Sequence, residues 1–110
     1  MKRRAAEMFI HLVLFKIKRK DLPAYVSDCE IWRKEAKRHE GFMGYRTLCR
    51  TDEKNQYASF YLWKSERDHR KFMKRHHDRL VSLSRCPVKV LGYYNFTTNG
   101  TIPLDHSPCS

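Results

Sequence analysis

The order of apolar patterns along this chain predicts an α+β domain in which a four-stranded antiparallel sheet carries two helices on one face. Strand-like and helix-like segments follow one another in the order strand, helix, two strands joined by a short turn, helix, strand. The first strand-like segment is apolar on both of its alternating faces, so both faces of the sheet need cover. A chain of 110 residues is long enough for one such domain.

The first expected strand covers residues 8–17, with the sequence MFIHLVLFKI. Alternate side chains of a strand point to opposite faces, so Phe9, Val13 and Ile17 share one face while Ile10 and Leu12 share the other. A lone subunit would leave one of these faces in water. We therefore expect helices on one side of the sheet and a second copy of the chain on the other.

A helix is expected next, beginning at Asp21, a residue type that favours the N-cap, with Pro23 in the first turn. Gly41 is expected to end the helix because glycine readily takes the left-handed conformation. Apolar residues recur at helical spacing between these two points, namely Leu22, Tyr25, Val26, Cys29, Trp32 and Ala36.

A hairpin should follow, with strands over 42–50 and 57–63 joined by the polar turn 51–56. Gly44 predicts a kink or bulge in the first of these strands. Ser65 is expected to cap a second helix of about 18 residues. The inward face of that helix would carry Phe72, Met73, Leu80 and Leu83, with His69 and His76 on the same side.

Pro87 ends the second helical region, and residues 88–96 are expected to form the fourth strand. The predicted domain therefore covers residues 8–97. Residues 1–7 and 98–110 are polar, and we expect them to be flexible tails.

Composition indicates the cellular compartment and the charge of possible partners, but it does not indicate the activity. The formal net charge of +11 favours association with anions but carries no argument about fold. Cys29, Cys49, Cys86 and Cys109 are scattered without metal-ligand spacing, which indicates a reducing compartment and predicts a cytoplasmic protein. No apolar run approaches the roughly 20 residues of a membrane span, so no membrane association is expected.

Several short motifs accompany this βαββαβ order. They are Glu40-Gly41-Phe42-Met43-Gly44, Trp63-Lys64-Ser65-Glu66, Phe72-Met73 and His76-His77-Asp78. Over residues 8–96 the chain resembles the antibiotic-biosynthesis-monooxygenase superfamily, and within it an uncharacterised bacterial subgroup. The resemblance implies a ferredoxin-like fold of the dimeric α+β barrel type. It also implies a homodimer whose sheets face each other and a pocket in each subunit between sheet and helices.

The resemblance implies a cofactor-independent monooxygenase, or a related enzyme, acting on a small hydrophobic molecule. The alternatives are a non-catalytic ligand-binding or structural dimer, a haem-binding or haem-degrading protein, and an RNA-binding module. The haem-degrading branch has an Asn, a Trp and a His at positions that here hold Val13, Phe72 and Ser82. No cofactor is therefore expected.

The histidines are the main candidates for catalysis. His69 and His76 stand seven residues apart on the second helix and would share a face, so His76 is the first candidate for a base or ligand contact. The alternative is that His69, His76 and His77 are solvated members of a basic helix. His11, the second candidate, lies in the middle of an apolar strand, where burial would lower its pKa; the alternative is a satisfied core histidine.

Aromatic side chains are expected to line a pocket for a planar apolar ligand, although ordinary core packing would explain them equally well. The expected ligand-binding residues are Trp63, Phe72, His69 and Tyr61, with Asn95 as an orienting amide. No set of metal ligands is expected. RNA binding has only a faint signal, Tyr57-Ala58 on the third strand, and the first strand is too apolar for an open RNA-binding face.

Overall fold

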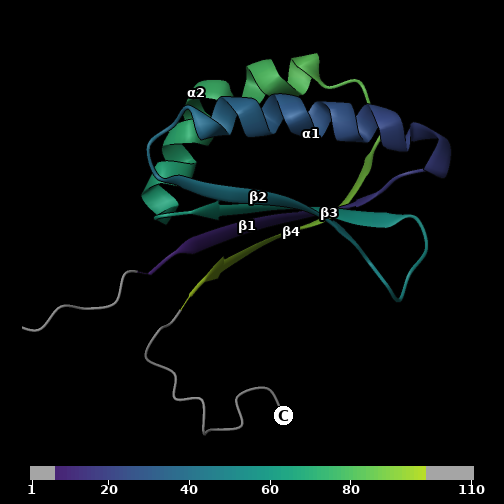
Figure 1. Cartoon of the computed structure of the whole chain (residues 1–110), viewed down its shortest axis with the longest axis horizontal. Helices are drawn as coiled ribbons and strands as arrows, with labels where there is room; N and C mark the ends of the chain where they lie inside the picture. The colour runs from purple at the N-terminus through teal and green to yellow at the C-terminus, as the bar shows by residue number, and fades with distance from the viewer. Residues whose placement is uncertain (1–6, 99–110) are drawn as a thin grey trace, which may run out of the picture.

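The computed structural model describes residues 7–98, which form the expected βαββαβ order (Figure 1). The strands are β1 (Phe9–Lys16), β2 (Phe42–Cys49), β3 (Gln56–Trp63) and β4 (Lys89–Thr97). The helices are α1 (Leu22–Lys37), preceded by a 3₁₀ turn over Arg19–Asp21, and α2 (Glu66–Leu83). Of the expected flexible tails, all but residues 7 and 98 lie outside the described residues.

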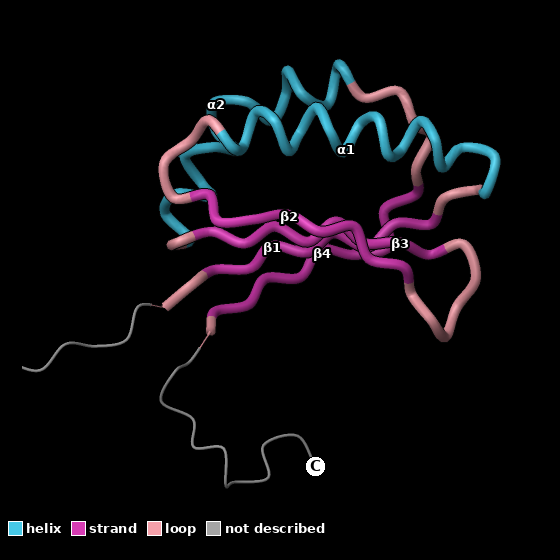
Figure 2. The backbone as a smooth tube through the Cα atoms, in the orientation of Figure 1, coloured by secondary structure: helices cyan, strands magenta, loops and turns pink. Residues whose placement is uncertain are grey.

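The four strands form one antiparallel sheet in the order β2-β3-β1-β4. Both helices lie on the same side of this sheet, and within residues 7–98 no helix covers the other side (Figure 2). This is the ferredoxin-like arrangement of dimeric α+β barrel subunits, so the predicted fold class is confirmed. Among the described residues, no helix is both long and apolar enough to cross a membrane.

Strand β1 is central and has two different apolar faces. Phe9, His11 and Val13 are buried beneath the helices, whereas Ile10 and Leu12 point to the open side and are half-buried. The predicted division of this strand into two apolar faces is therefore confirmed.

The core lies between the sheet and the helices in two adjacent clusters. Their buried members are Phe9, Ala36, Tyr61, Trp63, Phe72 and Leu80 in one, and Ile17, Tyr25 and Cys29 in the other. The expected core positions of Val26 and Leu83 are wrong, because 55% and 45% of these side chains are exposed. On α1, Tyr25 and Cys29 face the core, and Val26 lies to one side of them. Leu83 is the last residue of α2, where the helix side chains no longer pack on the core.

Local signals at the ends of elements account for several boundaries. The Ser65 hydroxyl accepts a hydrogen bond from the Asp68 amide at 3.1 Å, as expected of an N-cap. Gly41 has the predicted left-handed backbone, with φ of 90°, and the register shifts between Phe42 and Gly44 as a bulge requires. Asp21 occupies the N-cap position of α1, but its side chain makes no capping bond, because the 3₁₀ turn already leads into the helix.

The open face of the sheet is apolar over β1, β3 and β4. By register and alternation it carries Ile10, Leu12, Leu14, Phe60, Leu62, Tyr94 and Phe96. Tyr57 instead points to the helix side, where its ring centroid lies 6.4 Å from that of Tyr25. The Tyr57 signal for an RNA-binding face therefore loses its structural basis.

A buried carboxylate ties helix α1 to the connection between α2 and β4. Asp28 is 9% exposed, and its two oxygens accept hydrogen bonds from the amides of Arg85 at 3.0 Å and Cys86 at 2.8 Å. Nothing in the helical pattern marked Asp28 in advance, because its partners lie 57 and 58 residues away.

We predict that Asp28→Ala lowers the free energy of unfolding by about 1–3 kcal/mol, because it leaves two enclosed amides without an acceptor. Asp28→Asn should lose less, since the amide oxygen still accepts one hydrogen bond. Asp78→Ala, which removes a fully exposed carboxylate from α2, is the matched control and should be nearly neutral. Urea unfolding measures all three; equal losses in Asp28→Ala and Asp78→Ala would contradict the role given to Asp28.

Candidate functional site

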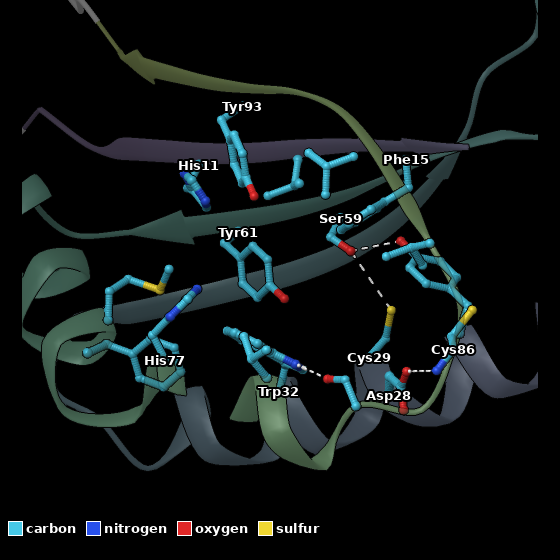
Figure 3. Close-up of a pocket in the computed structure, with 18 of the residues that line it drawn as sticks. His11, Phe15, Asp28, Cys29, Trp32, Ser59, Tyr61, His77, Cys86 and Tyr93 are labelled. Carbon is cyan, nitrogen blue, oxygen red and sulfur yellow. Dashed lines mark hydrogen bonds between the residues drawn. The ribbon is translucent and has the colours of Figure 1, made fainter. Parts of the chain in front are cut away.

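A cavity of about 390 Å³ lies between the helix-covered face of the sheet and the two helices. Its size is within the range of small-molecule sites. Its walls are mainly apolar and come from every layer, including Val13, Phe15, Trp32, Tyr61, Trp63, Phe72 and Met73. Figure 3 shows Tyr61 extending from the sheet into this space, with His11 and Tyr93 toward one end and Cys29 and Cys86 toward the other.

Most of the residues singled out in the sequence meet here. His11, Tyr61, Trp63, His69 and Phe72 all line the cavity. Asn95 approaches it through a hydrogen bond to His11. The presence of a cavity beside His11 is therefore as expected, while the chemical roles of these residues stay predictions.

His76 does not line the cavity, so its expected position is wrong. Helix α2 packs against the sheet through His69 but against α1 through His76, whose ring centroid lies 4.5 Å from that of His39. Positions seven apart therefore meet different neighbours, although they share a helical face. His77, one residue further along, lines the cavity instead.

His11 and Asn95 form the best-defined polar pair of the site. His11 Nδ1 lies 2.7 Å from Asn95 Oδ1, an oxygen that only accepts, so Nδ1 carries the proton and Nε2 keeps its lone pair. Burial lowers the pKa of His11, while the hydrogen bond to Asn95 opposes this shift. His11 is thus held as a neutral imidazole with one oriented, unprotonated nitrogen.

His69 adds a second neutral imidazole beside the first. The two ring centroids are 4.4 Å apart. Burial, followed by the neighbouring His11 and Arg70, lowers the pKa of His69 to about 4. Within the described residues, His69 Nδ1 and Trp63 Nε1 are buried without a hydrogen-bond partner. This end of the cavity has hydrogen-bonding capacity that the described side chains do not use.

A hydroxyl network closes the middle of the cavity, and Ser59 is its centre. Ser59 is 3% exposed, and its Oγ lies 2.7 Å from the Tyr25 hydroxyl, 3.1 Å from that of Tyr45 and 3.8 Å from Cys29 Sγ (Figure 3 shows the Cys29 contact as a dashed line). Burial raises the pKa of Tyr45 to about 12 and raises that of Tyr25 further. These phenols therefore stay protonated, so each can donate a hydrogen bond as well as accept one. The only sequence signal for this network was a serine on the inward face of an apolar strand.

The cavity opens beside β4, which the helices do not cover. Tyr93 lies on the helix side of this strand, close to His11, yet 64% of it is exposed. Val88 and Val90 line the same edge and are also exposed. A ligand would therefore enter between β4 and the helices and meet His11 next to Tyr93.

The positions that the haem-degrading branch would use do not supply a haem ligand here. Val13 and Phe72 are apolar walls. Ser82 is exposed on α2, and its hydroxyl donates to the Arg79 carbonyl oxygen at 2.6 Å. These three positions do not fit haem.

Two buried neutral histidines predict an acid-sensitive fold. Because the folded pKa of His69, about 4, lies below its ordinary value of 6.5, the unfolded chain binds the proton first as the pH falls. The contribution of neutral His69 to the free energy of unfolding is therefore fully present above about pH 6.5, and it is lost as the pH falls from there to about 4. For His69 alone we expect a loss of roughly 2 kcal/mol between about pH 7.5 and about pH 5.

Urea unfolding at the two pH values measures this loss. His69→Leu, which cannot be protonated, should lose correspondingly less stability than the unaltered chain. His77→Gln serves as the control because the His77 side chain is 47% exposed, and it should behave like the unaltered chain. The same acid loss in His69→Leu and in the unaltered chain would refute the assignment.

Comparison with solved structures places this architecture among known folds. The cofactor-independent oxygenase SnoaB from Streptomyces nogalater superposes with a TM-score of 0.63 at 16% identity, over 90% of this chain and 99% of that one. A candidate antibiotic biosynthesis monooxygenase from Nitrosomonas europaea gives 0.62 at 14% identity, over 94% and 98%. A conserved protein of unknown function from Bacteroides thetaiotaomicron gives 0.69 at 13% identity, over 86% and 100%.

No family model matches the sequence, and no curated protein matches it. At these identities the solved structures establish the fold and leave the activity open. The chain has the fold seen in antibiotic biosynthesis monooxygenases, and the resemblance predicted from its sequence is confirmed at that level.

Proposed function

We propose that this chain is a cofactor-independent oxygenase, or a closely related enzyme, that acts on a small, planar, hydrophobic molecule. The observation that carries the proposal is the His11–Asn95 pair in the wall of an otherwise apolar cavity. The similar fold of SnoaB, a cofactor-independent oxygenase, supports it by analogy.

The chemistry begins with a proton transfer to His11. A neutral imidazole with a free Nε2 can remove a proton from an acidic C–H or O–H of a substrate stacked among aromatic walls. The Asn95 oxygen holds the opposite Nδ1–H and favours the imidazolium that forms. Because burial lowers the pKa of His11, the base is unprotonated and ready at neutral pH.

Dioxygen is the co-reactant of the oxidative step. The substrate carbanion gives one electron to O₂, and the two radicals combine to form a C–O bond. The resulting peroxide takes up the proton held by His11 and loses water, leaving a carbonyl group. The net reaction consumes one O₂, replaces two hydrogens on one carbon by one oxygen, and releases one water.

Anthrone is a suitable probe because its ring-flanked CH₂ group ionises readily and the molecule is planar and apolar. Oxygen uptake with the unaltered chain should exceed the spontaneous rate, and His11→Ala should reduce this excess by about 100-fold or more, the usual contribution of a general base. Asn95→Ala should fall between the two. His76→Ala is the control, since His76 lies outside the cavity.

The outcome that would contradict the proposal is equal oxygen uptake in His11→Ala and the unaltered chain. Binding of anthrone without turnover, quenching Trp63 or Trp32 fluorescence, would instead support the alternative of a non-catalytic ligand-binding protein. The two functions are thereby separated with one set of proteins.

The enzyme is proposed to work as a homodimer that joins the open faces of two sheets. Those faces are apolar, and large exposed apolar patches mark association sites. Burial is worth about 25 cal/mol per Å² of apolar surface, which makes sheet-to-sheet packing favourable.

Cys29, Cys49 and Cys86 are free thiols, which supports placing the protein in the reducing cytoplasm.

Light scattering should therefore report a dimer at micromolar concentration. Leu12→Lys places a charge at the centre of the open face and should give monomers, because a desolvated ammonium without a partner is costly. Val26→Lys adds the same charge to an exposed position on α1 and should remain dimeric. A monomeric unaltered chain, or a dimeric Leu12→Lys, would contradict this interface.

A further inference from the structure

A second group of ligating side chains lies outside the cavity, where the end of α1 meets α2. Glu35 lies in the last turn of α1, and His39 lies in the turn that follows the helix, with its Nε2 3.9 Å from Glu35 Oε2. His76 approaches them from α2. The buried ring of Phe72 lies beneath both imidazoles, with centroid distances of 5.3 Å to His39 and 5.5 Å to His76.

The three donor atoms converge on one point. His39 Nε2 and His76 Nε2 are 2.7 Å apart, and each lies 3.9 Å from Glu35 Oε2. A tetrahedral ion with bonds of about 2.0–2.1 Å separates its ligand atoms by roughly 3.3 Å. The N–N separation is shorter than this value by roughly 0.6 Å and the two N–O separations are longer by roughly the same amount, so side-chain shifts of about half an ångström would equalise them.

We propose that Glu35, His39 and His76 bind one divalent first-row transition metal ion, and that Zn²⁺ fits this donor set best. Two imidazole nitrogens and one carboxylate oxygen are ligands that Zn²⁺ readily takes. Ca²⁺ and Mg²⁺ prefer oxygen ligands in larger number, so this group excludes them.

Accessibility suits an ion that keeps a solvent ligand. The side chains of His39 and His76 are each 18% exposed and that of Glu35 is 15% exposed. The site is thus open enough for an ion to enter and enclosed enough to hold the ligands in place. Three protein ligands would leave the fourth tetrahedral position to water.

The hydrogen bonds of Arg79 determine which contact and which proton must move when the ion binds. Its Nη2 donates to Glu35 Oε1 at 2.8 Å and to His76 Nδ1 at 2.9 Å. His76 Nδ1 is therefore an acceptor, and His76 Nε2 carries the proton and donates to His39 Nε2. Metal binding moves that proton to Nδ1 and breaks the Arg79 contact with His76, while Arg79 continues to orient the carboxylate from its other oxygen.

The positive charges around the site disfavour a cation held by electrostatic attraction alone, so an ion there must be held by coordinate bonds. Arg38 and Arg75 stand near His39, and Arg79 stands beside Glu35. The same arginines repel cations that bind by charge alone, whereas imidazole coordination can offset that repulsion.

Titration of the full-length chain with CoCl₂, followed by competition with ZnCl₂, tests the proposal. One equivalent of Co²⁺ should produce the visible absorption of a four-coordinate site, and Zn²⁺ should abolish it. Glu35→Gln, His39→Gln and His76→Gln should each weaken binding by about tenfold or more, since each removes a ligand. His77→Gln removes a neighbouring imidazole that points elsewhere, and it should bind as the unaltered chain does.

The double variant His39→Gln/His76→Gln identifies metal held anywhere else in the chain, because such binding would persist in it. Unchanged stoichiometric Co²⁺ binding in this variant would overturn the proposal, as would the absence of binding to the unaltered chain at micromolar concentration. If a variant does not fold, ¹⁵N spectra of the unaltered chain decide the matter. Zn²⁺ must shift the Nε2 signals of His39 and His76 and leave that of His77 in place.

Discussion

Strand β1 must be covered on both faces, and the rest of the structure follows from that requirement. It is hydrogen-bonded on one edge to β3 and on the other to β4, so it cannot move to the periphery of the sheet. Its inward face recruits α1 and α2 and thereby creates the cavity. Its outward face is also apolar and is not covered by any element of the described part of the chain, which is why the proposed dimer and the observed cavity have a common origin.

The cavity carries a stability cost that dense packing would have avoided. Positions 11 and 69 point into the core, where an aliphatic side chain would bury apolar surface without desolvating a titratable group. Burial keeps both imidazoles neutral, and only His11 has a hydrogen-bond partner for its Nδ1 within the described residues. Departures from local packing rules of this kind are concentrated at functional sites, which favours a chemical role for this pair over simple core packing.

The sequence predicts what depends on local periodicity and fails where distant segments meet. Alternation along β1 and β3 predicted which side chains of each strand share a face, and the order of the elements predicted the ferredoxin-like fold. His76 was misplaced because helical spacing fixes which side chains share a face and not which neighbour that face meets. Asp28 and His39 were missed for a related reason: their partners lie 57 and 37 residues away, and no short motif records such a contact.

Phe72 stands between the two proposed sites and determines how they can communicate. On one side its ring contacts Trp63, with centroids 5.3 Å apart, and it lines the cavity; on the other it supports His39 and His76. An ion bound between α1 and α2 changes ligand affinity only if it favours one arrangement of this wall over another. Phe72 is 1% exposed, and its ring is flanked by Trp63 on one side and by the two imidazoles on the other, which restricts its rotation. The physical consequence is that metal binding would mainly hold the helices together above a cavity whose shape is already set.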